Sequence, residues 1–201
     1  MLMIVRAGVV GRKMRVIGGR FRSRMLTAPR GMNTRPTSDR LRETIFNVIA
    51  PRIEGAKFVD LYAGSGAVGI EAISRGAEFC WFAEKAPAAV KAIRENLATL
   101  KVSDGFAVET RGASALLDEL VKRDERVDLV FLDPPYEDAA EYERTLKFLG
   151  GRGGAVLAED ARVIAEHRSK EELAERYGRL ERVRMLKQGD AALSFYARQP
   201  D

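Results

Sequence analysis

The sequence predicts an α/β fold in which helices cover both faces of a mostly parallel sheet. Apolar, strand-like runs alternate with helix-like segments between residues 58 and 158, a glycine-rich turn follows the first run, and an Asp-Pro-Pro-Tyr tetrapeptide follows the run at 127–132. Such alternation is typical of doubly wound parallel sheets. With 201 residues, 46% hydrophobic and 31% charged, the chain has the size and composition of one globular body with a small appendage.

Positive charge is concentrated near the N-terminus. The whole chain carries a net charge of +5, and residues 12–42 contain ten basic residues and one acid, Asp39. This asymmetry is typical of a polyanion-binding end, and also of a solvated basic tail. We divide the chain into a basic arm at residues 1–36 and a body at residues 37–201, and we interpret residues 1–13 as a start-site artefact or a disordered leader.

The composition argues against several classes of protein. No apolar run reaches the length of a membrane span, and the first residues lack the apolar stretch of a signal peptide. The single cysteine, Cys80, cannot form an internal disulfide, which fits a reducing cytoplasm. Because His167 is the only histidine, we expect neither a His/Cys metal cluster nor a Ser-His-Asp triad.

The segment before the sheet is predicted to be a basic hairpin followed by a helix. Residues 14–30 contain two short apolar and basic runs around a Gly-Gly pair. Ser38 is expected to cap a helix that continues to Ile49, because apolar residues recur at helical spacing behind it. We expect Pro51 to end this helix.

The body is predicted to alternate between strands and helices. The expected strands are residues 58–61, 79–83, 106–110, 127–132 and 155–158, and the expected helices are 67–75, 87–100, 113–122 and 139–149. The pattern then changes. A charged helix at 169–176 is followed by apolar runs at 182–186 and 192–196 around a Gln-Gly-Asp turn, which predicts a closing antiparallel hairpin.

A glycine-rich turn follows the first strand of the body. Gly64 and Gly66 permit a tight turn with backbone close to a ligand, and with Gly69 they complete the G-x-G-x-x-G pattern of dinucleotide sites. At the end of the strand, the Asp60 carboxylate can accept from an amino group, which favours S-adenosylmethionine over a pyrophosphate. Glu84 ends the next strand, where an acid can accept both ribose hydroxyls of an adenosine, as S-adenosylmethionine and NAD both require.

The tetrapeptide Asp133-Pro134-Pro135-Tyr136 follows a buried strand. Its two prolines fix φ and remove two backbone donors, so the acceptors left nearby are the Asp133 carboxylate and the Pro134 carbonyl. These acceptors can hold a planar exocyclic amine while Tyr136 stacks on its base. Because the carboxyl ends of parallel strands share one crevice, we expect the tetrapeptide to lie beside the donor held by the glycine turn. The tetrapeptide itself does not distinguish guanine from adenine.

Over nearly all of residues 14–198, the chain resembles the RsmD family of bacterial methyltransferases that act on guanine N2 of 16S ribosomal RNA. The motifs that carry the resemblance are Arg15-Val16-Ile17-Gly18-Gly19, the block from Arg35 to Asn47, Asp60 through Gly69, Asn96-Leu97 and Asp133-Pro134-Pro135-Tyr136. The block from Arg35 is the most specific, whereas the glycine turn and the tetrapeptide are shared by many amino-methyltransferases. The resemblance implies a Rossmann-like class I S-adenosylmethionine-dependent methyltransferase. Its sheet has seven strands, mostly parallel, with a C-terminal antiparallel hairpin and an N-terminal β-hairpin arm that helps to bind RNA.

The resemblance also implies three sets of site residues. The catalytic set is Asp133, Pro134, Pro135 and Tyr136. The cofactor-binding set is Asp60, Tyr62, Ala63, Gly64, Ser65, Gly66, Glu84, Lys85, Gly112, Ala113 and Asp133. The RNA-binding set is Arg15, Arg20, Arg22, Arg24, Arg35, Arg40 and Arg42. Family members often carry Asn or Asp near the adenine where this chain has Arg111-Gly112-Ala113, so we expect backbone contacts to the adenine there.

The expected partner is 16S ribosomal RNA, a small ribosomal subunit or an assembly intermediate, bound by a cytoplasmic monomer that uses no metal and no membrane. Three alternatives remain open. The first is an amino-methyltransferase that acts on adenine in DNA or RNA, or on a protein glutamine, with the same tetrapeptide. The second is an NAD(P)-dependent oxidoreductase built on the glycine turn. The third is a noncatalytic RNA-binding module, against which the intact tetrapeptide argues.

Overall fold

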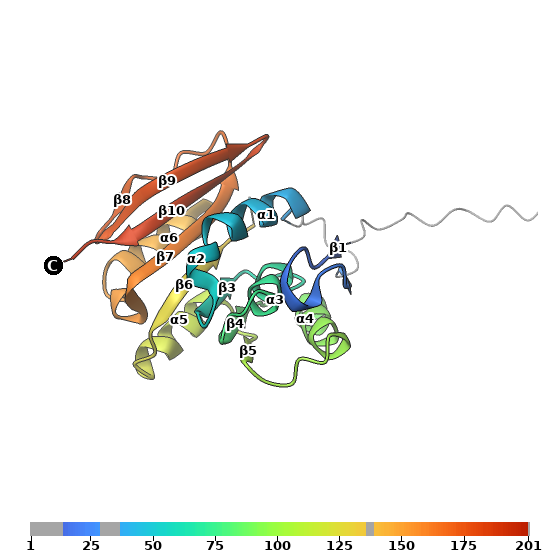
Figure 1. The fold of residues 1–201 in the computed structure, drawn as a ribbon. Helices are drawn as coiled ribbons and strands as arrows, with labels where there is room; N and C mark the ends of the chain where they lie inside the picture. Colours follow the sequence, from blue (N-terminus) through green and yellow to red (C-terminus); the bar gives the residue numbers. More distant parts are fainter. Residues whose placement is uncertain (1–13, 29–36, 136–138, 201) are drawn as a thin grey trace, which may run out of the picture.

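The computed structural model describes residues 14–28, 37–135 and 139–200. At its centre is an eight-stranded sheet with the order β5-β4-β3-β6-β7-β10-β9-β8 (Figure 1). The strands from β5 to β7 pair in parallel, and the remaining three join antiparallel. Their bounds are β3 Lys57–Leu61, β4 Phe79–Ala83, β5 Phe106–Glu109, β6 Val127–Leu132, β7 Leu157–Arg168, β8 Arg176–Tyr177, β9 Leu180–Gln188 and β10 Ala191–Arg198. The predicted seven-stranded sheet with its closing hairpin is confirmed, and the two-residue β8 is added at the edge.

Helices cover both faces of the sheet, as predicted (Figure 1). One apolar cluster contains side chains of α1 to α4 and the other contains side chains of α5 and α6. The central strands β3 and β6 are largely apolar and are buried on both faces because both of these clusters cover them. The helix bounds are α1 Asp39–Val48, α2 Ala50–Ile53, α3 Ala67–Ser74, α4 Pro87–Thr99, α5 Ala113–Lys122 and α6 Ala139–Gly150. Among the described helices, none has both the length and the apolar character needed to cross a bilayer.

The N-terminal segment forms a small antiparallel hairpin, as predicted. Its strands β1 (Met14–Arg15) and β2 (Met25–Leu26) pair with each other and not with the main sheet. A short 3₁₀ helix, Gly19–Phe21, lies between them. Gly19 has φ +71°, and a Cβ at this position would lie 1.8 Å from the Ser74 carbonyl oxygen of α3. Only glycine therefore permits this close packing of the hairpin on the body.

The predicted cap of α1 is confirmed. The Ser38 hydroxyl accepts a hydrogen bond from Leu41 N at 3.2 Å and so satisfies one amide of the first helical turn. The helix ends at Val48, one residue earlier than expected. Pro51 does not terminate it, because this proline lies in the first turn of α2, where a missing amide hydrogen is tolerated.

Two predicted elements near the C-terminus need correction. The first two residues of the expected strand 155–158 lie in a 3₁₀ turn and its last two begin β7, which runs from Leu157 to Arg168 because it pairs with β6 on one side and β10 on the other. The expected helix 169–176 is absent, since none of the residues from 169 to 176 is helical in the described structure. Tertiary contacts hold this segment extended. Tyr196 Oη donates to Ala174 O at 2.9 Å, and Ala174 N donates to Tyr177 Oη at 3.0 Å.

Candidate active site

The parallel strands end together at one edge of the sheet. Leu61, the last residue of β3, pairs with Ala83 of β4 and Leu132 of β6, and Ala83 pairs with Glu109 of β5. The glycine turn, Glu84, the loop after β5 and Asp133 each follow one of these aligned strand ends. The predicted convergence of the site segments is therefore present in the structure.

The three glycines of the turn have different roles. Gly64 and Gly66 have φ of +56° and +79°, and Gly66 begins α3. A Cβ on Gly64 would meet nothing within 4 Å, so the turn leaves open space there. A Cβ on Gly69 would lie 2.3 Å from the Phe82 ring, so this glycine permits α3 to pack closely on β4.

Asp60 lies beneath the glycine turn and binds the first turn of α3. Its side chain is only 1% exposed, and Oδ2 accepts a hydrogen bond from Gly69 N at 2.8 Å. Burial raises the pKa of Asp60 to about 7, against the lowering effect of the Gly69 amide, and Glu84 raises it further. In the structure Asp60 thus orders the start of α3, and its predicted contact with a cofactor remains untested.

Glu84 connects the turn to the neighbouring loop. Its Oε2 accepts from Gly64 N and its Oε1 from Ala86 N, both at 2.8 Å. These two bonds fix the plane of the half-buried carboxylate, and each oxygen retains a further lone pair for a ligand hydroxyl. The arrangement suits the predicted ribose contact.

The remaining residues of the turn are held by their neighbours. Tyr62 has φ +65°, and its hydroxyl donates to Glu141 Oε2 of α6 at 2.6 Å and lies 3.0 Å from Thr145 Oγ1. Its side chain therefore points to α6, so any cofactor contact at Tyr62 would come from its backbone. Ala63 N donates to Ala83 O at 2.9 Å, which joins the turn to β4.

The loop after β5 is shaped by Gly112. This residue has φ +97°, and a Cβ on it would lie 2.3 Å from Lys85 Cε, so the stem of Lys85 covers the glycine. Ala113 is buried at the start of α5. Arg111 lies outside this contact and pairs with Glu109 at 2.7 Å, which lowers the Glu109 pKa to about 2. These positions leave backbone atoms next to Lys85, where the adenine contact is predicted.

Asp133 lies at the same level of the sheet as Glu166, a buried acid that the sequence interpretation missed. Leu132 pairs with Ala165 of β7, so the residue that follows each of them, Asp133 and Glu166, lies at the same level of the sheet. Burial raises the pKa of Asp133 well above its ordinary value, and the negative charges of Glu166 and Asp60 raise it further. The sequence signal for Glu166 was an acid directly after the short apolar run at 163–165.

The immediate surroundings of Asp133 are ordered by the other residues at this edge. Glu166 is 4% exposed, and its Oε2 accepts from Thr37 Oγ1 at 2.8 Å. This bond fixes the start of α1 at the edge of the sheet where Asp133 follows β6. Pro134 is buried and Pro135 is exposed. Tyr136 and Arg35 lie outside the described residues. In the part of the chain that is described, no three metal-ligating side chains lie close enough together to bind an ion.

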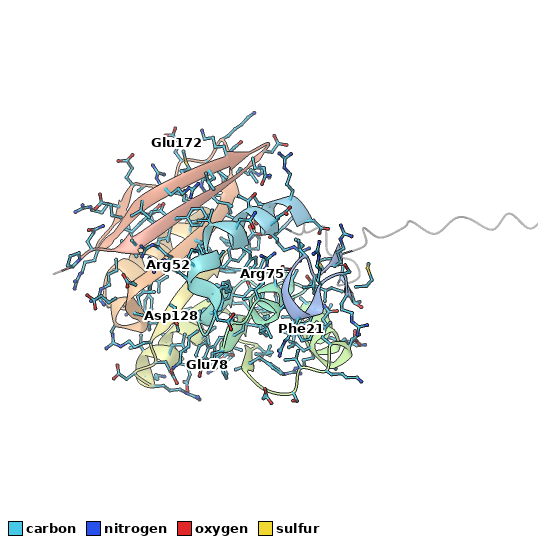
Figure 2. The ribbon with its side chains drawn as sticks, viewed as in Figure 1. Phe21, Arg52, Arg75, Glu78, Asp128 and Glu172 are labelled. Carbon is cyan, nitrogen blue, oxygen red and sulfur yellow. The ribbon has the colours of Figure 1, made fainter. Side chains whose placement is uncertain are left out.

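The arm is fixed to the body by a buried acid of α3. Glu71 is fully buried, and its two carboxylate oxygens accept from Ile17 N and Gly18 N, both at 2.7 Å. Arg75 Nε donates to the same carboxylate at 2.7 Å. Figure 2 labels Arg75 and Phe21 in this region, where Phe21 N donates to Ser74 Oγ at 2.9 Å.

One RNA-binding prediction must be corrected. Arg42 is fully buried, with one guanidinium nitrogen donating to Asp39 Oδ1 at 2.7 Å and to Arg15 O at 2.9 Å, and another lying 3.9 Å from Glu71 Oε2. A buried guanidinium cannot reach a phosphate, so Arg42 is a structural residue of the junction between arm and body. The other described arginines of the predicted set, Arg15, Arg20, Arg22, Arg24 and Arg40, are exposed. Of these, Arg15 pairs with Asp39 at 3.3 Å.

Comparison with known proteins gives a consistent result. The model of a family described as "Conserved hypothetical protein 95" matches residues 14–197. The "Putative rRNA methyltransferase YlbH" of Bacillus subtilis is 37% identical over 92% of this chain and 100% of its own length. "Ribosomal RNA small subunit methyltransferase D" of Escherichia coli is 38% identical over 77% of this chain and 74% of its own length.

Solved structures agree with these relatives. The "Putative methyltransferase yhhF from Escherichia coli" superimposes with a TM-score of 0.79 at 33% identity, covering 93% of this chain and 98% of that one. A more distant methyltransferase, SMU.776, which was solved in complex with SAH, shares the fold with a TM-score of 0.62 at 11% identity, over 78% of this chain and 49% of that one.

Proposed function

This chain belongs to the Conserved hypothetical protein 95 family, which includes rRNA methyltransferases related to RsmD and YlbH, and from that membership we propose that it methylates the exocyclic N2 of a guanine in 16S ribosomal RNA. The methyl donor is S-adenosylmethionine. The reaction takes place in the cytoplasm on the RNA itself, on a small subunit or on an assembly intermediate.

One observation carries the proposal. Asp133 follows β6, which pairs directly with β3, and β3 leads into the glycine turn that Glu84 holds in place. An acceptor for an amine and a candidate cofactor cradle thus lie on adjacent strand ends. Such an arrangement brings two reactants into one crevice and removes much of the entropic cost of their encounter.

The residues of the crevice fit S-adenosylmethionine. The open space at Gly64, the fixed carboxylate of Glu84 and the backbone at Gly112 and Ala113 provide contacts for the adenosyl group. The acidic surroundings of Asp133 favour a cationic ligand, since a positive charge there offsets the mutual repulsion of the carboxylates. When bound, S-adenosylmethionine supplies an electrophilic methyl group.

Asp133 and the Pro134 carbonyl then hold the acceptor amine. The lone pair of guanine N2 is partly delocalised into the ring, which makes the amine a poor nucleophile. Hydrogen bonds from N2–H to these two acceptors would favour a pyramidal nitrogen and aim its lone pair along the line of transfer. The bond from N2 to the methyl group would form as the sulfur–methyl bond of the donor breaks and S-adenosylhomocysteine is left. The N2 proton would then pass to water, so no strong base is required. We keep Tyr136 as the proposed stacking partner of the extruded base.

The basic arm provides the contacts to the polyanion. Arg20, Arg22 and Arg24 are exposed on the hairpin, and Arg40 is exposed at the start of α1. Phosphate contacts from these side chains would give a salt-dependent affinity. We also assign Arg35 to this surface, and we propose that the protein acts as a monomer.

The test is transfer of tritiated methyl groups from S-adenosylmethionine to small ribosomal subunits from cells that lack this protein, followed by mapping of the labelled nucleotide. Label at guanine N2 is the expected result. Parallel reactions with DNA and with protein separate the alternative acceptors, because label on adenine or on a glutamine would overturn the proposed specificity. Asp133→Ala serves as the inactive control.

A further inference from the structure

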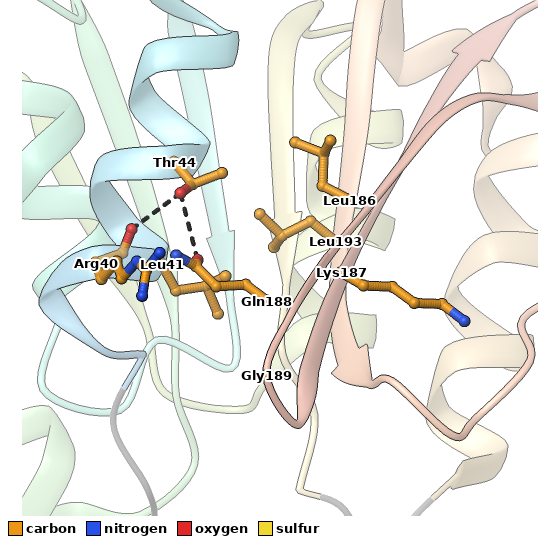
Figure 3. A pocket seen from close by; sticks show the side chains of 8 residues that line it. All are labelled: Arg40, Leu41, Thr44, Leu186, Lys187, Gln188, Gly189 and Leu193. Carbon is orange, nitrogen blue, oxygen red and sulfur yellow. Dashed lines mark hydrogen bonds between the residues drawn. The ribbon is translucent and has the colours of Figure 1, made fainter.

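A hollow lies between α1 and the β9–β10 turn, at the edge of the sheet where Asp133 follows β6, and we call it the α1–β9 pocket (Figure 3). Its volume is about 350 Å³. The pocket has an apolar floor, formed by Leu41, Leu186 and Leu193. Its rim is polar and is formed by Arg40, Thr44 and Gln188. None of its lining residues belongs to the glycine turn or to the tetrapeptide.

Cross-strand pairing connects this pocket to Asp133. Leu193 pairs with Glu166 of β7 on one side and with Leu186 of β9 on the other. Residues directly opposite each other on neighbouring strands point to the same face, so Glu166 and the pocket floor share the face covered by α1. Burial raises the pKa of Asp133 most, and the negative charge of Glu166 raises it further, as does that of Asp60. Two strand spacings separate Asp133 from β10, or about 10 Å.

The polar groups of the rim are available to a ligand. The Thr44 hydroxyl lies 3.0 Å from Arg40 O and 3.3 Å from Gln188 Oε1, and its single hydrogen must serve both acceptors (Figure 3). The Gln188 amide nitrogen makes no hydrogen bond to the described part of the chain, and within the same residues the Arg40 guanidinium has no acidic partner. Lys187 also lines the pocket, and its side chain extends away from α1 (Figure 3).

We propose that the α1–β9 pocket binds one unstacked nucleobase of the substrate RNA, next to the methylated guanine in the chain. This inference rests on the proposed function and names a further part of its binding site. The apolar floor contacts the flat base, the Gln188 amide bonds to the base edge, and Arg40 binds the adjoining phosphate. The pocket volume is near the lower end of the range of roughly 300–1,000 Å³ for small-ligand sites, which suits a single base and not a duplex.

The first experiment measures methyl transfer to small subunits from cells that lack this protein. Gln188→Ala and Arg40→Ala are each expected to raise KM for the subunits about tenfold, the equivalent of about one hydrogen bond, and to change kcat less than about twofold. Lys122→Ala is the matched control, because Lys122 is an exposed cation at the end of α5, at the opposite edge of the sheet. An unchanged KM in both pocket variants would overturn the inference.

The second experiment separates a bound base from a general attraction of charge. Short RNAs around the mapped guanine carry an abasic nucleotide on one side of it or on the other. Wild-type protein should lose about tenfold in kcat/KM with one of the two abasic RNAs, and Gln188→Ala should lose no more when the same base is removed. Equal losses in both proteins would show that Gln188 does not contact that base. If wild-type protein fails to methylate ribosomal RNA at all, the proposed function is wrong, and this inference, which rests on it, is wrong as well.

Discussion

Asn96 holds Thr27 through both polar atoms of its side chain. Its Oδ1 accepts from Thr27 N at 2.7 Å and its Nδ2 donates to Thr27 O at 3.0 Å. The second hydrogen of Nδ2 goes to Ser65 O of the glycine turn, also at 3.0 Å. One side chain, only 2% exposed, therefore joins the basic arm to the glycine turn, and the position of the arm depends on that of the turn.

Replacing Asn96 with alanine should loosen both segments at once. The change removes three hydrogen bonds and leaves the Ser65 carbonyl without this partner, at a cost of about 1–3 kcal/mol in the free energy of unfolding. We also expect weaker binding of S-adenosylhomocysteine, measured by calorimetric titration, because the turn loses a support. Asn47→Ala is the matched control, since Asn47 is exposed on α1. Unchanged stability together with unchanged ligand affinity would contradict the bridging role.

Salt titration should distinguish a phosphate-binding arginine from a structural one. Arg22 is exposed on the arm, so Arg22→Ala should lower the slope of log K against log salt for RNA binding by about 0.7–0.9, the value for one phosphate contact. Arg42→Met should leave that slope unchanged in the folded protein, because the native guanidinium is buried. A reduced slope for Arg42→Met would mean that the junction between arm and body opens to expose this residue.

The buried acid of the same junction should be important for stability. Glu71→Gln keeps an acceptor for one of the two arm amides but removes the buried charge that pairs with Arg75 at 2.7 Å and faces Arg42 at 3.9 Å, and breaking a buried pair costs up to about 3–5 kcal/mol. Chemical denaturation measures the loss, and limited proteolysis should show earlier cleavage of the arm. Glu78→Gln, at an exposed acid, should change neither readout.

Much of the fold could be predicted because its signals are local. Periodicity and caps identified the strands and helices from β3 to α6, and the Ser38 cap is confirmed. The segment after β7 could not be predicted in this way. A run of good helix formers at 169–176 is held extended by Tyr177 and Tyr196, and these contacts are invisible to a local pattern.

The site residues that could be predicted are those that directly follow a strand. Glu84 and Asp133 follow strands that had already been recognised, so their convergence followed from the topology. Arg42 shows the limit of the same reasoning. Its charge suggested a phosphate contact, whereas its burial depends on Glu71, which is distant in the sequence and is brought near only by packing of the arm on α3.

Substitutions at Asp133 should distinguish a hydrogen-bond acceptor from a base. Asp133→Ala should reduce turnover by about 10²–10³-fold and leave the affinity for S-adenosylhomocysteine nearly intact. Asp133→Asn keeps an acceptor oxygen, so it should retain more activity than the alanine variant. Because the pKa of Asp133 is raised, wild-type kcat/KM should increase with pH as the carboxylate ionises, and the asparagine variant should lack this dependence. Equal, complete loss in both variants would instead indicate an obligatory proton transfer.

Asp60 should make the ligand-free protein less stable as the pH rises. Its pKa is about 7 in the folded state against the ordinary 3.8, so between these values the folded state binds more protons than the unfolded chain. This contribution to stability is present below about pH 4 and is lost as the pH rises through about 7, at a total cost of up to about 4 kcal/mol. Asp60→Asn keeps an acceptor for Gly69 N without the charge, so its unfolding free energy, measured by denaturant titration from pH 5 to 8, should fall less steeply than that of wild type. As the control, Asp118→Asn, at an exposed acid of α5, should show the wild-type dependence of unfolding free energy on pH. If Asp60→Asn also showed the wild-type dependence, ionisation of the Asp60 carboxylate would not destabilise the fold.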